Sequence, residues 1–319
     1  MLLTLFQQKG VETALPGTAV SPGNSAGFKE GINEHAVLEK SNAMNEYVIK
    51  IAAFIKDRSR LSFTGHKLSV LRQRLETRLE QLNLADFSAY WELLLRNPAE
   101  EFQLFELATT NETSFFRNAA QFAYLQERII PSLELRSTEE NSRVRILSAG
   151  CSTGEEPYSI AMTLRDALSS SDNLSPEIIA GDLSENCLRV ARDGCYDADK
   201  LTRLPGGYRQ RFMTETVDGA RVRGDIREMV RFVRLNLDDL MNSDSPAWNQ
   251  GLGLFEVIFC RNVMIYFAPS CQQKLVDTLH RLLQPGGYLF TGDAEPLHLF
   301  SHEFRPVAEA KCLIYQKME

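Results

Sequence analysis

Hydrophobic residues between positions 46 and 127 recur at the spacing of amphipathic helices. A first stripe comprises Val48, Ile51, Ala52 and Ile55, and a second, at steps of three and four, comprises Leu68, Leu71, Leu75, Leu79 and Leu82. A third helix is expected at 87–95, ending before Asn97-Pro98, and a fourth at 100–107. The pattern predicts an all-α domain over residues 44–127.

Beyond residue 128, short apolar runs alternate with helical stretches. The predicted strands are 145–149, 177–182, 230–235, 255–260 and 287–291, followed by an antiparallel pair at 304–308 and 312–316. Helices centred near Ala161, Val190 and Leu275 follow the first, second and fourth strands. This alternation predicts an α/β domain over 128–319, built on a seven-stranded mixed sheet. Residues 194–229 interrupt it with glycine turn signals, which indicate a small inserted β-subdomain.

Residues 1–43 are rich in glycine and proline and show little periodicity, so we expect a flexible tail. At the end of this tail, the segment Ser41-Asn-Ala-Met44 resembles the remnant of a cleaved expression tag. On that interpretation Met44 is the natural first residue.

Composition narrows the classes of function. The 319 residues carry a formal net charge of -7, which argues against nucleic acid as the main partner. No apolar run approaches the roughly 20 residues of a membrane span, and the N-terminus lacks a basic signal-peptide region. The six cysteines show neither C-x-x-C pairs nor zinc spacing. We therefore expect a cytoplasmic protein with free thiols, no metal site and no membrane anchor.

The glycine turn after the first predicted strand is the main candidate for ligand binding. The apolar run 144–147 leads into Ala149-Gly-Cys-Ser-Thr-Gly154, and a helix follows, which is typical of a nucleotide-binding corner. Glu155 and Glu156 suit the helix dipole but would repel the pyrophosphate of a dinucleotide. S-adenosylmethionine, which has a cationic tail and no phosphate, fits better than NAD. A plain glycine turn in a doubly wound domain remains the alternative.

Polar residues also end the later strands. Asp182 ends the second strand, where an acid can accept hydrogen bonds from ribose hydroxyls, while Asn236 and Asn262 end the third and fourth. Arg261 and Tyr266 flank the same predicted crevice. Each alone could be an ordinary strand-end residue, but together they indicate a binding site. The polar segment 109–118 either caps the next helix or closes one side of this site, and the residues leave both interpretations open.

The helical domain carries a local excess of positive charge. Residues 50–80 contain eight Lys or Arg and three acids, a net +5. Lys67, Arg74 and Arg78 share one helix face. Such a face is either solvated surface or a docking site for an acidic partner.

Three segments together resemble the CheR-type chemoreceptor glutamate methyltransferases over residues 46–317. They are Asn111-Glu-Thr-Ser-Phe-Phe-Arg117, Ser148-Ala-Gly-Cys-Ser-Thr-Gly-Glu-Glu-Pro-Tyr-Ser159 and Phe259-Cys-Arg-Asn-Val-Met-Ile-Tyr-Phe267. The resemblance implies a helical N-terminal domain and a Rossmann-like methyltransferase domain with a β-subdomain. It also implies S-adenosylmethionine as donor, S-adenosylhomocysteine as product and glutamates of methyl-accepting chemoreceptors as acceptors. We expect the enzyme to act as a monomer.

The resemblance also implies roles for individual residues. Arg117 and Tyr266 would lie nearest the transferred methyl group, and Asp182 would hold the ribose. Glu155 or Glu156 would take the methionine ammonium, and the choice stays open. Arg117 is also an implied cofactor contact, and the others are Asn111, Thr113, Gly150, Asn236, Leu237, Arg261 and Asn262. Gly150 stands where alanine is expected in many members, a change that should not impair binding.

A non-catalytic receptor-docking module that keeps the cofactor fold is the competing hypothesis. The presence of Arg117, Glu155, Asp182 and Tyr266 together speaks against it, because a non-catalytic copy need not retain them. The sequence alone does not identify the receptor.

Overall fold

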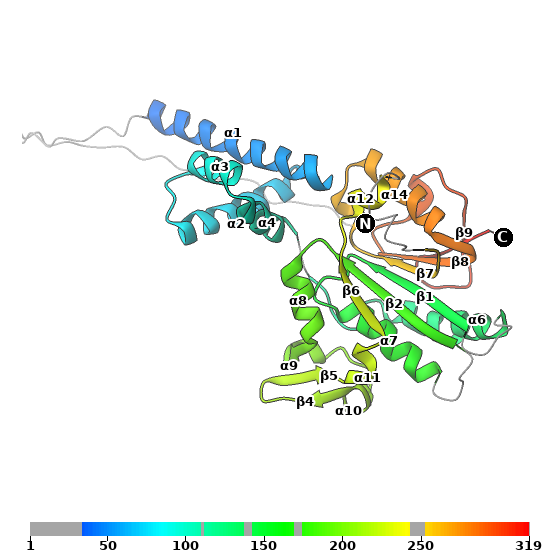
Figure 1. The fold of residues 1–319 in the computed structure, drawn as a ribbon. Helices are drawn as coiled ribbons and strands as arrows, with labels where there is room; N and C mark the ends of the chain where they lie inside the picture. The colour runs from blue at the N-terminus through cyan, green and yellow to red at the C-terminus, as the bar shows by residue number, and fades with distance from the viewer. Residues whose placement is uncertain (1–33, 110–111, 137–141, 169–173, 243–252, 319) are drawn as a thin grey trace, which may run out of the picture. The chain divides into compact units, whose positions relative to one another are not determined.

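The computed structural model describes residues 34–109, 112–136, 142–168, 174–242 and 253–318. Residues 42–319 form one compact unit, and of the preceding unit only the start of helix α1 is described (Figure 1). Among the described residues, no helix combines the length and apolarity needed to cross a membrane.

Four helices open the described chain: α1 (Glu34–Ser59), α2 (His66–Leu82), α3 (Phe87–Arg96) and α4 (Pro98–Ala108). Helix α1 begins at Glu34, within the stretch 1–43 that the sequence analysis expects to be a tail. Residues 1–33 lie outside the described part, and the tail stays a prediction. Helix α3 begins where the Asp86 side chain accepts a hydrogen bond from the Ala89 N–H at 3.0 Å. Asn97 separates α3 from α4, and Pro98 is the first residue of α4, as the X-Pro signal predicts.

The central sheet confirms the predicted fold class. Its order is β6-β2-β1-β7-β8-β10-β9, and pairing is parallel from β6 to β8 and antiparallel beyond (Figure 1). The strand order reverses beside β1, which places a ligand crevice at the carboxyl ends of β1 and β7. The strands are β1 (Ser142–Ala149), β2 (Leu174–Asp182), β6 (Val230–Arg234), β7 (Phe255–Cys260), β8 (Leu283–Thr291), β9 (Phe304–Pro306) and β10 (Ile314–Lys317).

Helices on both faces of the sheet give two hydrophobic cores. Side chains alternate between the faces, so Ile146 belongs to one core and Leu147 to the other, as do Ile178 and Ile179. Helices α7 (Glu155–Ala167) and α8 (Glu185–Asp193) supply the first core, and α12 (Leu237–Met241) and α14 (Pro269–Leu282) supply the second. Smaller helical elements are α5 (Ala119–Tyr124), η1 (Leu125–Ile129), α6 (Ile130–Arg136), η2 (Met264–Tyr266) and η3 (Leu297–Leu299).

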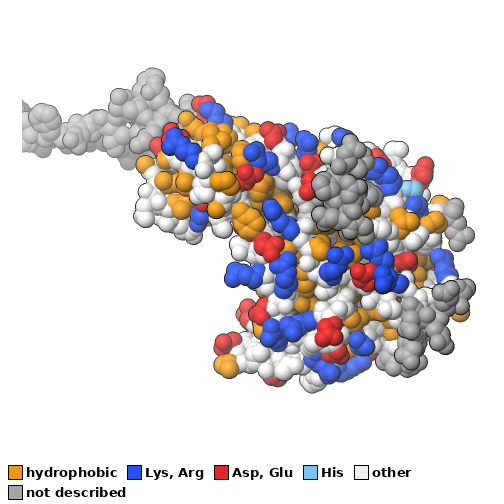
Figure 2. Space-filling model, viewed as in Figure 1, with side chains coloured by type: hydrophobic (Ala, Val, Ile, Leu, Met, Phe, Trp, Pro, Cys, Tyr) orange, Lys and Arg blue, Asp and Glu red, His pale blue; other side chains and the backbone are white. Residues whose placement is uncertain are grey.

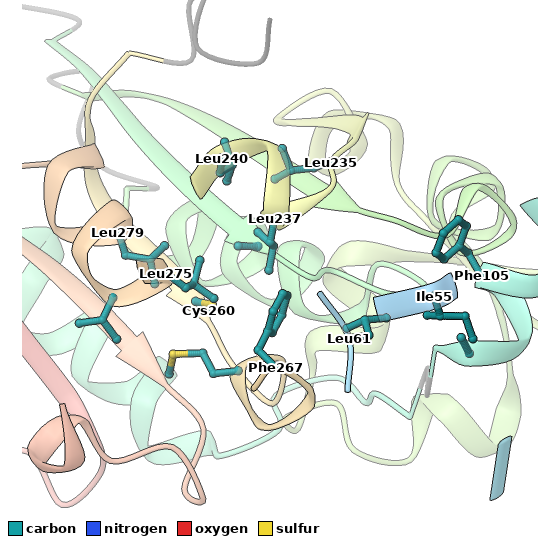
Figure 3. Packing of buried hydrophobic residues seen from close by; sticks show 14 of the residues in the cluster. Ile55, Leu61, Phe105, Leu235, Leu237, Leu240, Cys260, Phe267, Leu275 and Leu279 are labelled. Carbon is teal, nitrogen blue, oxygen red and sulfur yellow. The ribbon is translucent and has the colours of Figure 1, made fainter. Parts of the chain in front are cut away.

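The second core continues into the helical domain. Ile55 of α1 and Phe105 of α4 belong to the same buried cluster as Leu237 and Phe267 of the sheet domain (Figure 3). Leu61, in the linker between α1 and α2, forms an isolated antiparallel bridge with Phe267. The end of α1 is therefore fixed against the crevice side of the sheet domain.

The predicted β-subdomain is a three-stranded antiparallel sheet of order β3-β5-β4. Gly219, at the start of β5, allows close pairing, because a Cβ there would lie 2.0 Å from the Tyr196 carbonyl oxygen. The subdomain elements are β3 (Cys195–Asp197), α9 (Ala198–Leu201), α10 (Tyr208–Phe212), β4 (Met213–Glu215), β5 (Gly219–Val222) and α11 (Gly224–Arg227).

Candidate active site

A pocket opens at the carboxyl ends of β1, β2, β6 and β7, where the strand order predicts a crevice. The predicted residues in its lining are Thr113, Arg117, Gly150, Glu156, Asp182, Asn236, Leu237, Arg261, Asn262 and Tyr266. Glu155 is not among the described lining residues, and Asn111 lies outside the described part of the chain. Lining residues that the sequence did not single out include Ser59 and Leu61 from the end of α1 and its linker.

Asp182 is a buried carboxylate, 8% exposed, with both oxygens engaged by the backbone. Its Oδ1 accepts a hydrogen bond from the Ser184 N–H at 2.9 Å, and its Oδ2 accepts one from the Ser152 N–H at 2.8 Å. Burial raises the pKa of Asp182, against the opposing effect of these N–H donors. The remaining lone pairs can accept hydroxyl donors of a ligand.

The two adjacent glutamates have different environments. Glu155 is fully buried and pairs with Lys200 of the β-subdomain at 2.6 Å, while Thr153 donates to it at 2.6 Å. Glu156 lines the pocket, where it accepts hydrogen bonds from Ser148 at 2.8 Å and Arg261 at 2.9 Å. Burial raises the pKa of Glu156, partly offset by Arg261. Of the two alternatives, Glu156 is therefore the one placed to meet a cationic ligand group.

The glycine turn is closed by backbone hydrogen bonds. The N–H groups of Gly150 and Cys151 both donate to the Gly181 carbonyl, at 2.8 and 3.0 Å. Gly150 has a φ of 84°, and a Cβ there would lie 2.4 Å from Val263 Cγ2. An alanine at this position would require Val263 to move, so glycine suits this chain.

The segment before α5 presents Arg117 to the pocket. Phe116 and Asn118, on either side of Arg117, have φ values of 50° and 63°, a conformation that is uncommon outside glycine and that concentrates at functional sites. The Phe116 N–H donates to Ser159 Oγ at 2.9 Å, and Arg261 Nη2 donates to the Arg117 carbonyl at 2.5 Å. Thr109 is the C-cap of α4 and Asn118 the N-cap of α5. Of the two interpretations of 109–118, the pocket wall is the one this arrangement favours.

Tyr266 ends the short helix η2 and also lines the pocket. Lys67 of α2 donates to the Ile265 carbonyl, and its ammonium lies 5.1 Å from the centre of the Tyr266 ring. The neighbouring Asn262 has a φ of 58°. A carboxylate that the sequence analysis missed, Glu295, accepts hydrogen bonds from the backbone N–H groups of Asn262 and Ile265. Its position just after strand β8 is the signal that could have identified it.

Asn236, the other amide predicted at a strand end, is held by two hydrogen bonds. Asn236 caps α12 by accepting from the Asp238 N–H at 3.1 Å, and its Nδ2 donates to the Arg58 carbonyl at 3.1 Å. Both bonds hold the β6–α12 turn against the end of α1.

The three cations of the predicted docking face have partners within the chain. Lys67 contacts the Ile265 carbonyl, as described above. Arg74 donates to the carbonyls of Leu107 and Thr109 at the end of α4, at 2.8 and 2.9 Å. Arg78 pairs with the buried carboxylate of Glu100 at 2.8 Å. Each of the three cations therefore has its own contact within the chain, and the choice between solvated surface and docking site stays a prediction. Figure 2 shows basic and acidic side chains interspersed on the face it presents.

The pocket fits a donor with an adenosine and a charged amino-acid tail. It offers a buried acid at a strand end and a second acid beside an arginine. No cluster of His, Cys, Asp and Glu in the described residues is suited to a metal ion.

Comparison with known proteins agrees with this geometry. The profile of the family described as "CheR methyltransferase, SAM binding domain" matches residues 111–312, and "CheR methyltransferase, all-alpha domain" matches 48–109. The chain belongs to the CheR methyltransferase family. S-adenosylmethionine is the cofactor of this CheR methyltransferase.

Three relatives illustrate the similarity. "Chemotaxis protein methyltransferase 2" of Pseudomonas aeruginosa is 36% identical over 253 residues, covering 78% of this chain and 86% of the relative. "Chemotaxis protein methyltransferase" of Escherichia coli is 37% identical over 259 residues, 79% and 84% of the two chains. "Probable biofilm formation methyltransferase WspC" of Pseudomonas aeruginosa is 33% identical over 263 residues, 82% and 60%.

Proposed function

We propose that this CheR methyltransferase transfers a methyl group to glutamate side chains of chemoreceptor cytoplasmic helices, forming γ-methyl esters. The observation that carries the proposal is one pocket whose lining combines two acids, Asp182 and Glu156, with Arg117 and Tyr266. The acids suit the donor, and the guanidinium suits a carboxylate acceptor.

Residues at the ends of strands and helices would bind the donor, S-adenosylmethionine. Asp182 would accept hydrogen bonds from the ribose hydroxyls, and Glu156 would meet the methionine ammonium. The adenine and methionine ends would lie against Asn236, Leu237, Arg261 and Asn262, with Thr113 and Gly150 nearby. Bound S-adenosylmethionine supplies an electrophilic methyl group on a sulfonium.

Methyl transfer to the acceptor requires the glutamate carboxylate to be aligned with the donor methyl group, and it requires no proton transfer. A glutamate side chain is ionised at neutral pH, so it attacks without a general base. No histidine is found among the described residues that line the pocket. Arg117 would orient the carboxylate, and the Tyr266 hydroxyl would donate one further hydrogen bond, while the pocket walls exclude water. A contact of modest strength is expected, because strong pairing would reduce the nucleophilicity of the carboxylate.

The pathway is proposed as chemotaxis or a related sensory system. Two of the relatives above are named for chemotaxis and one for biofilm formation. Because the proposed acceptor glutamates lie on receptor cytoplasmic domains, we propose that the enzyme is cytoplasmic. We also propose that it acts as a monomer. Receptor docking by Lys67, Arg74 and Arg78 stays a prediction, and its test must include a stability measurement because each cation has an internal partner.

Methyl transfer from labelled S-adenosylmethionine to a panel of receptor cytoplasmic domains tests the proposal. Label is expected on at least one domain, and alkali should release it, because a carboxyl methyl ester is base-labile. A matched domain with its candidate glutamates changed to alanine should take up none. Alkali-stable label, or no label on any receptor domain, would refute the glutamate assignment.

A further inference from the structure

The turn Gly292–Glu295, directly after strand β8, contacts both segments that carry the proposed acceptor-side residues. One segment is 114–118, with Arg117, and the other is 261–266, with Tyr266. No residue of the turn is among the described lining of the pocket. Any effect of the turn on chemistry must therefore pass through these two segments.

Glu295 holds the second segment by its backbone. The side chain is 4% exposed, and its Oε2 accepts from the Asn262 N–H at 2.6 Å and the Gly292 N–H at 2.9 Å. Its Oε1 accepts from the Ile265 N–H at 3.2 Å. Hydrogen bonds from N–H groups to a carboxylate are stronger than neutral ones, and their loss would leave buried donors without partners. These bonds maintain the left-handed conformation of Asn262.

Gly292 allows this contact to form. A Cβ at this position would lie 2.7 Å from Glu295 Oε2 and 2.9 Å from the Asn262 backbone nitrogen. Any larger residue would push the 261–266 segment away from the turn. The close approach agrees with the hydrogen bond between Glu295 and Asn262, because it involves the same two atoms.

Asp293 holds the first segment. Its Oδ1 accepts from Asn118 Nδ2 at 2.8 Å. Asn118 directly follows Arg117 and has a left-handed φ of 63°, so this bond stabilises a backbone conformation that the chain does not otherwise favour. The two carboxylates of one turn thus contact both segments that carry the proposed acceptor-side residues.

We propose that the turn Gly292–Glu295 is a positioning clamp that sets Arg117 against Tyr266 for methyl transfer. The inference rests on the proposed function, in which these two residues lie at the reacting end. Asp293 and Glu295 are positioning residues that act through the segments they hold, without touching the donor or the acceptor.

A double-mutant cycle tests the Asp293–Asn118 bond. Asp293→Ala and Asn118→Gly each remove it, and glycine keeps the left-handed φ available. Each should lower kcat about tenfold with the affinity for S-adenosylhomocysteine unchanged, and the double variant should be no worse than either single variant. Asp293→Asn retains the acceptor oxygen and should recover most of kcat. Glu303→Ala, at an exposed acid remote from the pocket, is the matched control.

Unchanged kcat in Asp293→Ala, or losses that multiply in the double variant, would overturn the clamp. So would equal losses in Asp293→Asn and Asp293→Ala, because a bond to the retained oxygen could then not be the cause.

Amide hydrogen exchange supplies a readout that needs no acceptor. Glu295→Gln places an amide N–H₂ against one of the backbone donors, so exchange should become faster in 261–267 and stay the same in 275–282. Unchanged exchange in 261–267 would overturn the role of Glu295. A wild-type protein that methylates no receptor would refute the proposed function instead, and the exchange result would still decide whether Glu295 holds the 261–266 segment.

Discussion

The donor side and the acceptor side of the pocket are built in different ways. On the donor side, Asp182 ends a parallel strand and Glu156 lies in the first turn of α7, so regular elements position both acids. On the acceptor side, Arg117 lies in an irregular segment between two left-handed residues, and Tyr266 ends the short helix η2 that follows the left-handed Asn262. Side chains from distant parts of the chain contact both segments. The difference predicts that changes on the donor side will weaken binding, whereas changes on the acceptor side will slow turnover.

Arg117→Ala should give the largest effect. We expect kcat to fall about 100-fold or more while the dissociation constant for S-adenosylhomocysteine stays nearly constant, because the guanidinium is proposed to orient the acceptor carboxylate. The kcat of Arg117→Lys should lie between those of the wild type and Arg117→Ala, since lysine keeps the charge but lacks the planar guanidinium. Turnover assays at saturating donor, with calorimetry for product binding, make the measurement. If Arg117→Ala lowered the affinity for S-adenosylhomocysteine as much as kcat, the proposed difference between the donor side and the acceptor side would be wrong.

Asp182→Ala should weaken donor binding by about 1–3 kcal/mol through lost hydrogen bonds to ribose hydroxyls. Calorimetry with S-adenosylmethionine and S-adenosylhomocysteine measures this directly. Asp218→Ala, at an exposed acid in the β-subdomain turn, should leave both affinities unchanged. An unchanged affinity in Asp182→Ala would show that its two backbone contacts are its whole role.

Tyr266→Phe removes only a hydroxyl group. We expect kcat to fall about tenfold, the effect of one modest hydrogen bond, with product affinity preserved. Because Lys67 contacts the Tyr266 ring, which phenylalanine retains, the fold of this wall should persist. A weaker product affinity together with a normal kcat would show that Tyr266 binds the donor and does not position the acceptor.

The smallest expected effect is a pH dependence of donor affinity. Burial raises the pKa of Glu156 above its ordinary value of 4.5, so on acidification it takes up a proton earlier than an exposed glutamate would. Protonation removes the charge that would meet the ammonium, and affinity should therefore fall as pH drops through this raised pKa. Glu156→Gln should reduce the dependence, the remainder coming from Asp182, whose pKa burial also raises, and Glu155→Gln should leave it in place. Titrations from neutral pH downward that show no decline in the wild type would contradict the assignment.

The same comparison separates what sequence can predict from what it cannot. The sheet, its two-faced strands and the acids and amides at strand ends follow from local periodicity, so the fold class and the strand-end part of the lining could be predicted. The choice between Glu155 and Glu156 depends on Lys200, which lies in the inserted β-subdomain. The partners of Arg74 and Arg78 come from α4, and Asp293 of the Gly292–Glu295 turn contacts Asn118, which is far away in the sequence. The start of α1 was missed because the glycine and proline content of the preceding residues obscured it.

Mapping the methylated residue in a receptor cytoplasmic domain by fragment mass spectrometry tests the central claim most directly. The account predicts a single methyl group on glutamate side chains after reaction with wild-type enzyme, and almost none with Arg117→Ala at saturating donor. Methyl groups on lysine, arginine or a chain terminus, or equal glutamate methylation by the Arg117→Ala variant, would contradict it.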